Sequence, residues 1–182
     1  MTRIAIIAAF TARLLMADVR QCACDPATPE TLTARECSLC NEADRHTGDG
    51  DIFFLKDNNP RKPNRWLALP RTHAAGSHPL HALPQQIQIK LWTEAIAKAQ
   101  DLWGPTDWGI AYNGEINRTQ CHGHVHIGKL LKGLAPGKYK DVSGPAAIRL
   151  IKDGSGVWIH PIPGGKLRVH FGEGITETVL LR

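Results

Sequence analysis

The sequence predicts an α+β fold, with an antiparallel sheet of about five strands, one long helix and a C-terminal β extension. Apolar residues in segment 84–103 recur every three to four positions, which is the period of an amphipathic helix. Short β-favouring runs on both sides of this segment are separated by Gly-, Pro- and Asn-rich loops. The 182 residues, 42% of them hydrophobic, fit one globular unit with a sizeable core.

The N-terminal 21 residues allow two interpretations. Residues 4–10 are apolar and follow Arg3, and residues 15–17 resemble a cleavage site, so the segment reads as an export signal. Arg13 interrupts the apolar run, and a short N-terminal helix of a cytosolic protein is the alternative. The run is too short and too charged for a transmembrane helix.

The predicted elements follow one another without a repeat or a low-complexity tract. Before the helix we expect loop 22–36, turn 41–50, strand 51–55, loop 57–64 and strand 66–70. Pro84 suits the first helical turn, and Gly104 with Pro105 ends the helix. After it we expect strand 108–112, loop 113–121, a histidine-bearing strand that ends at Lys129, loop 130–144 and strands 146–151, 157–160, 166–171 and 177–181.

The formal net charge of +5 favours anionic ligands such as phosphates. Lys and Arg form no dense stripe interleaved with aromatic residues, so nucleic acid is not an expected partner. Cys37 and Cys40 have the two-residue gap with which two thiolates reach one tetrahedral zinc ion, and a disulfide or redox pair is the alternative. Five cysteines, an odd number, argue against a framework made only of disulfides.

Three histidines at alternate positions dominate the segment 112–129. In a strand, His122, His124 and His126 would share one face, while Val125 and Ile127 would point to the other. Imidazole titrates near neutral pH, binds metals and can attack phosphorus. The plain alternative is a set of surface or core histidines without a chemical role, but three on one face favour a functional site.

The spacing of these residues resembles the histidine triad (HIT) superfamily of nucleotide hydrolases and transferases. Asn113, Gln120, His124 and His126 match the family pattern, and the third triad position falls on Gly128. The run 118–127 is most similar to the CDP-diacylglycerol pyrophosphatase branch. This register implies His126 as the nucleophile; a rival register, with His122, His124 and His126 as the triad, would make it His124.

The resemblance also implies roles for individual residues and a division of the chain. The catalytic residues would be His126, His124 and Gln120, and the substrate-binding residues Asn113, Arg118, Gln120 and His122. Zinc-containing members imply a structural zinc site made by Cys37, Cys40, His73 and His124. No organic cofactor is expected. Residues 22–132 would form the HIT-like catalytic domain, and 133–182 a β extension of the same domain.

The expected function is therefore hydrolysis of a nucleotide phosphoanhydride through a covalent nucleotidyl-histidine, with a CDP-diacylglycerol pyrophosphatase-like activity. The alternatives are a soluble dinucleoside-polyphosphate or phosphoramidate hydrolase, or a nucleotidyltransferase. A different class is a non-catalytic, zinc-stabilised module that binds nucleotides or RNA. The expected partners are a nucleotide-containing small molecule or nucleotide-activated lipid, a second copy in a homodimer, and a membrane surface. An exported, periplasmic location is favoured over a cytoplasmic one.

Overall fold

The computed structural model describes residues 19–72, 75–134, 137–150 and 152–182. The predicted export segment lies outside this part of the chain except for Val19–Gln21, which form a short 3-10 helix. Within the described ranges, no helix has both the length and the apolar character needed to cross a membrane.

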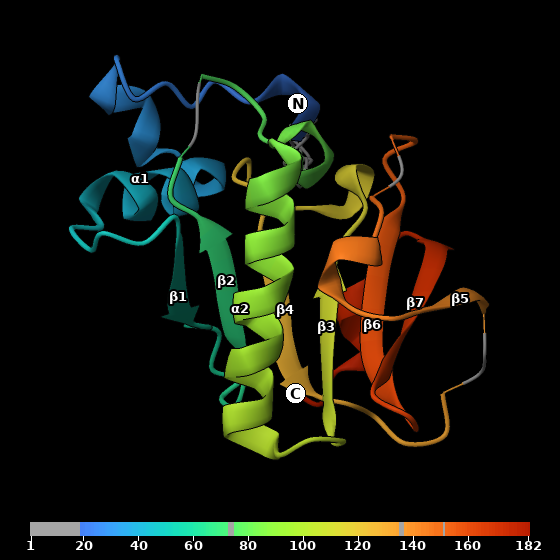
Figure 1. Ribbon diagram of the computed structural model, residues 1–182. Helices are drawn as coiled ribbons and strands as arrows, with labels where there is room; N and C mark the ends of the chain where they lie inside the picture. Colours follow the sequence, from blue (N-terminus) through green and yellow to red (C-terminus); the bar gives the residue numbers. More distant parts are fainter. Residues whose placement is uncertain (1–18, 73–74, 135–136, 151) are drawn as a thin grey trace, which may run out of the picture.

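The core of the protein is a seven-stranded antiparallel sheet, so the fold is α+β as predicted. Its strands are in the order β1-β2-β4-β3-β6-β7-β5 (Figure 1). The strand bounds are Ile52–Lys56 (β1), Trp66–Pro70 (β2), Trp108–Tyr112 (β3), Val125–Lys129 (β4), Lys138–Val142 (β5), Gly156–Ile162 (β6) and Lys166–Glu173 (β7).

The predicted number of about five strands in the sheet is too low, because the C-terminal strands continue the same sheet and do not form a separate hairpin. β6 pairs with β3 and β7 pairs with β5, so the extension is hydrogen-bonded into the sheet. β5 lies in the predicted loop 130–144. The predicted strands 146–151 and 177–181 are wrong: 3-10 helices occupy Pro145–Ala147 and Thr176–Val179 instead.

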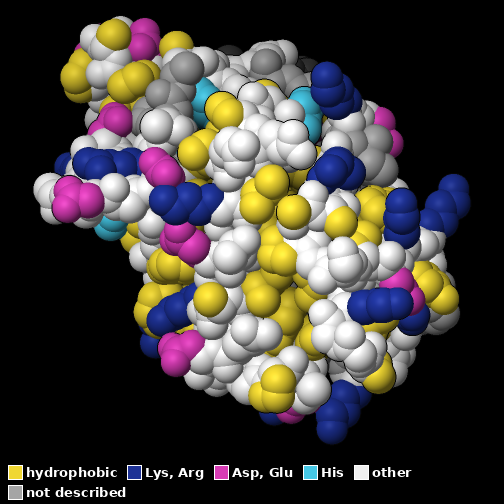
Figure 2. Space-filling model, in the orientation of Figure 1, with side chains coloured by type: hydrophobic (Ala, Val, Ile, Leu, Met, Phe, Trp, Pro, Cys, Tyr) yellow, Lys and Arg dark blue, Asp and Glu magenta, His cyan; other side chains and the backbone are white. Residues whose placement is uncertain are grey.

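The long helix α2, Gln85–Trp103, confirms the predicted amphipathic segment. It lies across one face of the sheet (Figure 1) and buries Leu91, Ala95 and Ala99 on a single stripe. Gly104 ends it with a φ of 73°, a conformation that a side chain would disfavour. Hydrophobic side chains also reach the surface beside this helix (Figure 2).

The hairpin between β6 and β7 also confirms the sequence prediction. Ile162 pairs with Lys166, and the turn contains Gly164 and Gly165, whose φ angles are 81° and 71°. Two consecutive residues with positive φ are required by the tight turns that match the twist of a hairpin.

The short helix α1, Ser38–Arg45, was not predicted from the sequence. It buries Leu39 and Ala43 against β1 and β2 in a small cluster that includes Phe53, and it buries Cys40 among the other cysteines. Its remaining residues are polar, so its composition resembles that of a turn. This helix forms one wall of the site described next.

Candidate functional site

A cavity of about 580 Å³ lies over the sheet at β4 and beside α1. Five residues predicted from the sequence line it together: Asn113, Arg118, Gln120, His124 and His126. Other lining residues come from α1, from the β1–β2 connection and from the C-terminal 3-10 helix, and include Arg35, Glu42, Lys56, Asp57, Lys62 and Glu177. The structure thus brings these five positions together at one cavity.

The three histidines do not form a row on one strand, so that prediction is wrong. β4 begins only at Val125, and of the three only His126 belongs to it. His122 is fully buried, and its backbone forms an isolated β-bridge with that of His78. It is not among the residues that line the cavity. The structure therefore does not place His122 where a substrate would contact it.

His126 is held by the sheet itself. Its backbone lies opposite Leu67 of β2 and Ala111 of β3, in the middle of the antiparallel ladder. Val125 and Ile127 point into the core beneath α2, so alternation sends His126 to the other face, where the cavity lies. A side chain placed by a central strand has little freedom to move.

His124 lies just before β4 and close to His126, with a ring-centroid separation of 4.9 Å. Its Nδ1 lies 2.8 Å from the carbonyl oxygen of His122, so Nδ1 carries the proton and donates it. Burial lowers the pKa of His124 to about 4. The ring is therefore neutral near pH 7, with its lone pair on Nε2. A backbone carbonyl therefore fixes the tautomer of His124.

His126 has a different environment. Its Nδ1 is buried, without a hydrogen-bond partner among the described residues, and lies 3.7 Å from Oε2 of Glu177. Burial, followed by the neighbouring His124, lowers the pKa of His126 well below its ordinary value. The imidazole is thus neutral, which is the form that acts as a nucleophile.

Glu177 is the main site residue that the sequence analysis missed. It belongs to the 3-10 helix Thr176–Val179, in a segment that the sequence predicted to be a strand. Its Oε2 forms ion pairs with Lys62 and with Arg65, whose Nη1 is 2.6 Å away. Burial alone would raise the pKa of Glu177, but the positive charges around it, which are His126 once it is protonated in acid and Lys62 and Arg65 throughout, outweigh burial and lower the pKa to about 2. No local motif marks this residue in the sequence.

Asn113 connects β3 to this C-terminal 3-10 helix. Its Oδ1 accepts a 3.0 Å hydrogen bond from the backbone N–H of Glu177 and a 3.3 Å bond from the hydroxyl of Thr176. Its Nδ2 donates to Oε1 of Glu177 at 3.3 Å. The amide predicted to contact substrate therefore holds a second site residue in place.

Gln120 similarly builds the wall of the cavity. Its Oε1 accepts from Ser38 Oγ at 2.9 Å and from the backbone N–H of Leu39 at 3.3 Å, and its Nε2 donates to the Arg35 carbonyl at 3.0 Å. The side chain thus ties the loop before β4 to the start of α1. A catalytic role for Gln120 would require these bonds to be exchanged for bonds to a substrate.

Arg118 is almost fully buried behind the cavity, at 2% exposure. Its guanidinium donates to the Cys121 carbonyl and to Ser77 Oγ, both at 3.3 Å, and its Cζ lies 5.7 Å from the Tyr112 ring centroid. Its charge contributes to the lowered pKa of His124. It therefore adds positive potential to the site while fixing the loop that carries the histidines.

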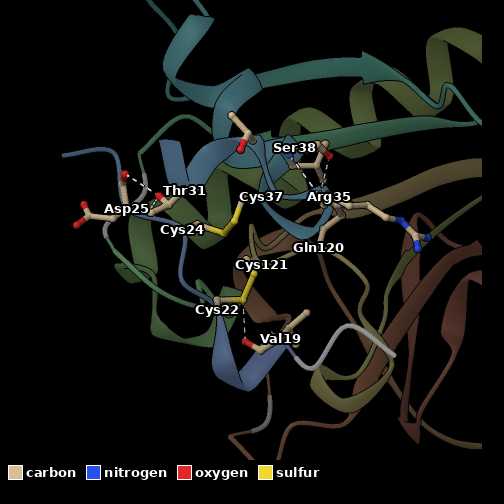
Figure 3. Close-up of a disulfide and its surroundings, with 12 residues drawn as sticks. Val19, Cys22, Cys24, Asp25, Thr31, Arg35, Cys37, Ser38, Gln120 and Cys121 are labelled. Carbon is tan, nitrogen blue, oxygen red and sulfur yellow. Dashed lines mark hydrogen bonds between the residues drawn. A yellow bond between two sulfur atoms is a disulfide. The ribbon is translucent and has the colours of Figure 1, made fainter. Parts of the chain in front are cut away.

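The cysteines form two disulfides rather than the predicted zinc ligands. Cys24 is bonded to Cys37 and Cys22 to Cys121, so the two bonds lie side by side (Figure 3). The sulfurs of Cys22, Cys24 and Cys121 are within 4.8 Å of one another, close enough for a metal if the bonds were open. The disulfides join the N-terminal segment to α1 and to the loop before β4.

The four residues predicted to bind zinc do not fit the ion. Cys37 is bonded to Cys24, and His73 lies outside the described residues. Cys40 is a buried free thiol, and burial, then Asp44, raises its pKa to about 11. In a disulfide-bonded chain this set cannot supply a closed tetrahedral site.

The position that would carry the third histidine of a triad is packed against the C-terminal segment. A Cβ added to Gly128 would lie 3.2 Å from the Cβ of Leu180, so a larger side chain has no room unless that segment moves. Compared with models of protein families, the chain matches none, and no curated protein sequence matches it. The likeness to the HIT superfamily therefore rests on the spacing of the residues quoted above.

Proposed function

We propose that the protein hydrolyses a nucleotide phosphoanhydride through a covalent nucleotidyl-histidine on His126. The observation that carries this proposal is a neutral imidazole on a central strand, facing a cavity whose cations include Lys62, Lys56 and Arg35. A cavity of about 580 Å³ is within the size range of small-molecule sites. Neutral imidazole supplies the nucleophile, and the cations suit a phosphate chain.

The reaction has two balanced steps. The lone pair on Nε2 of His126 attacks the phosphorus that carries the nucleoside, and the P–O bond to the leaving phosphate breaks with its electrons. Water then attacks the same phosphorus, the P–N bond breaks, and its electrons return to Nε2 while the water proton passes to solvent. A phosphate leaving group has a low pKa and departs without a general acid, which suits a site where Gly128 replaces the third histidine.

An apolar feature next to the site favours a substrate with a hydrophobic leaving group. A second cavity, about 490 Å³, shares Lys62 and Glu177 with the first and is lined by Leu131, Leu180 and Leu181. An acyl chain could lie there while the diphosphate contacts the cations at the junction. This supports a CDP-diacylglycerol pyrophosphatase-like substrate over a second nucleoside, and with it contact with a membrane surface.

Two further parts of the proposal concern location and zinc. The two disulfides form and persist in oxidising compartments, which supports an exported protein. The zinc site predicted at Cys37, Cys40, His73 and His124 is not part of this proposal; in a reduced chain the Cys22, Cys24 and Cys121 sulfurs would be a different candidate set. No step of the proposed reaction depends on that ion.

The test is intact-mass analysis of the protein after rapid quenching with CDP-, ADP- and GDP-containing substrates. We expect a nucleotide adduct that maps to His126 and is absent from the His126→Ala variant. His46→Ala is the matched control, because His46 stacks on Phe53 away from the cavity. An adduct on His124 would exchange the roles of the two histidines. Nucleotide binding without adduct or turnover would instead establish the non-catalytic binding module.

A further inference from the structure

We propose that Glu177 is a positioning residue for His126: its carboxylate keeps the proton on Nδ1, so that the lone pair of Nε2 faces the substrate. The reaction part of this inference rests on the proposed function. The tautomer of His126, in contrast, is a property of the chain alone and can be measured without substrate.

The first support is the buried edge of the imidazole. Nδ1 of His126 has no hydrogen-bond partner among the described residues, and the nearest carboxylate oxygen, Oε2 of Glu177, is 3.7 Å away. This separation is too long for a hydrogen bond, but a shift of about 1 Å would create one. Catalytic hydrogen bonds are often long in the free enzyme and shorten in the complex. Among the described residues, Glu177 is the one carboxylate within 4 Å of this nitrogen, and this makes it the candidate acceptor.

The second support is that Glu177 is held as a fixed, charged group. Arg65 and Lys62 both contact Oε2, and Asn113 donates to Oε1. Arg65 is itself anchored, because it donates to the carbonyls of Leu180 and Leu181 at 2.6 and 3.0 Å. A carboxylate has about four acceptor sites, and these three contacts leave one, on Oε1, because Lys62 and Arg65 occupy the two on Oε2. A rotation of the carboxylate group would turn this free site toward Nδ1–H.

This arrangement matches the charge change in the reaction. When Nε2 bonds to phosphorus, the ring becomes an N-phosphoryl imidazolium that still carries the Nδ1 proton. Glu177 would then accept a charge-assisted hydrogen bond from Nδ1, which is stronger than a neutral one. When water cleaves the P–N bond, the ring is neutral again and the same tautomer is restored, so Glu177 need not gain or lose a proton.

The same contacts permit a competing role, in which the carboxylate occupies the place of a substrate phosphate on Lys62 and Arg65. In that case Glu177 would inhibit binding, and its removal would lower KM and leave kcat unchanged. The two roles therefore predict opposite changes in the kinetics.

The experiment compares the wild type with Glu177→Gln and Glu177→Asp by ¹⁵N NMR of histidine side chains, followed by kinetics. We expect His126 of the wild type to carry its proton on Nδ1. The Gln amide can donate to Nδ1 and move the proton to Nε2, with kcat lowered roughly 10²–10⁴-fold and KM little changed. Glu177→Asp keeps the charge and should keep the tautomer.

Glu30→Gln, an exposed carboxylate far along the chain, is the matched control and should behave as wild type. An unchanged His126 tautomer in Glu177→Gln would overturn the inference, as would a lower KM with unchanged kcat. If Glu177→Gln does not fold, the test uses the other two proteins. A His126 proton on Nε2 in the wild type or in Glu177→Asp would also overturn the inference. The expected tautomer without any nucleotide adduct would mean that the proposed function, and not the positioning role, is wrong.

Discussion

The redox state of the five cysteines gives the sharpest test of the structure, because the disulfide and zinc interpretations predict different thiol counts. With both disulfides formed, only Cys40 is free. We therefore expect one titratable thiol per chain when the protein is unfolded without reductant, and none in a Cys40→Ala control. A zinc-bound chain would instead release five thiols together with a metal ion.

The two disulfides should also stabilise the fold by different amounts. Cys22–Cys121 spans 99 residues and Cys24–Cys37 spans 13, which correspond to about 4.7 and about 2.9 kcal/mol by loop-closure entropy. The paired substitution Cys22→Ser/Cys121→Ser should therefore lower the free energy of unfolding more than Cys24→Ser/Cys37→Ser.

Guanidinium titrations of the three proteins measure this order. The first pair should also reduce activity, since Cys121 directly follows Gln120, whose amide fixes the start of α1. The reasoning is refuted by a thiol count of five in fresh protein, or by a Cys24/Cys37 pair that matters more for stability than the longer loop.

Three further predictions concern stability. Arg65→Met should lower the free energy of unfolding by about 1–3 kcal/mol, because it removes one charged partner from the half-buried Glu177. Urea titration measures this change, and Lys90→Met, which breaks an exposed ion pair, should change little. The free energy of unfolding should fall between pH 6.5 and pH 4, because burial lowers the pKa of His124 and of His170 to about 4 in the folded chain. In this range the unfolded chain binds protons on these two histidines and the folded chain does not. Urea titrations at several pH values that show no such slope would contradict this. Gly123→Ala should destabilise by about 1–3 kcal/mol, since its Cβ would lie 2.3 Å from the carbonyl oxygen of residue 78; an unchanged melting temperature would contradict it.

The elements predicted correctly are those whose signal is local. The 3.6-residue period determines α2, and the runs 66–70 and 108–112 coincide with β2 and β3. Two glycines in a row determine the β6–β7 turn. In each case the element is determined by a few neighbouring residues, through either their apolar repeat or a backbone angle that the turn requires.

The elements predicted wrongly are those that depend on distant contacts. Helix α1 is polar on most of its surface, and its buried residues Leu39 and Ala43 acquire packing partners only when β1 and β2 are in place. β5 is exposed along most of its length and exists because it pairs with β7. Residues 177–181 look like a strand, but Asn113 and Arg65 hold them in another conformation.

For the site, the sequence by itself determined the group Asn113, Gln120, His124 and His126, because their spacing along one loop and strand brings them to one cavity. Only the tertiary structure decided what surrounds them. It brings Glu177 and Lys62, which are 115 residues apart, into contact beside His126, and joins Cys22 to Cys121 across 99 residues. The physical reason is that short-range spacing fixes which face a side chain takes, whereas ion pairs and disulfides form between whichever groups the folded sheet brings together.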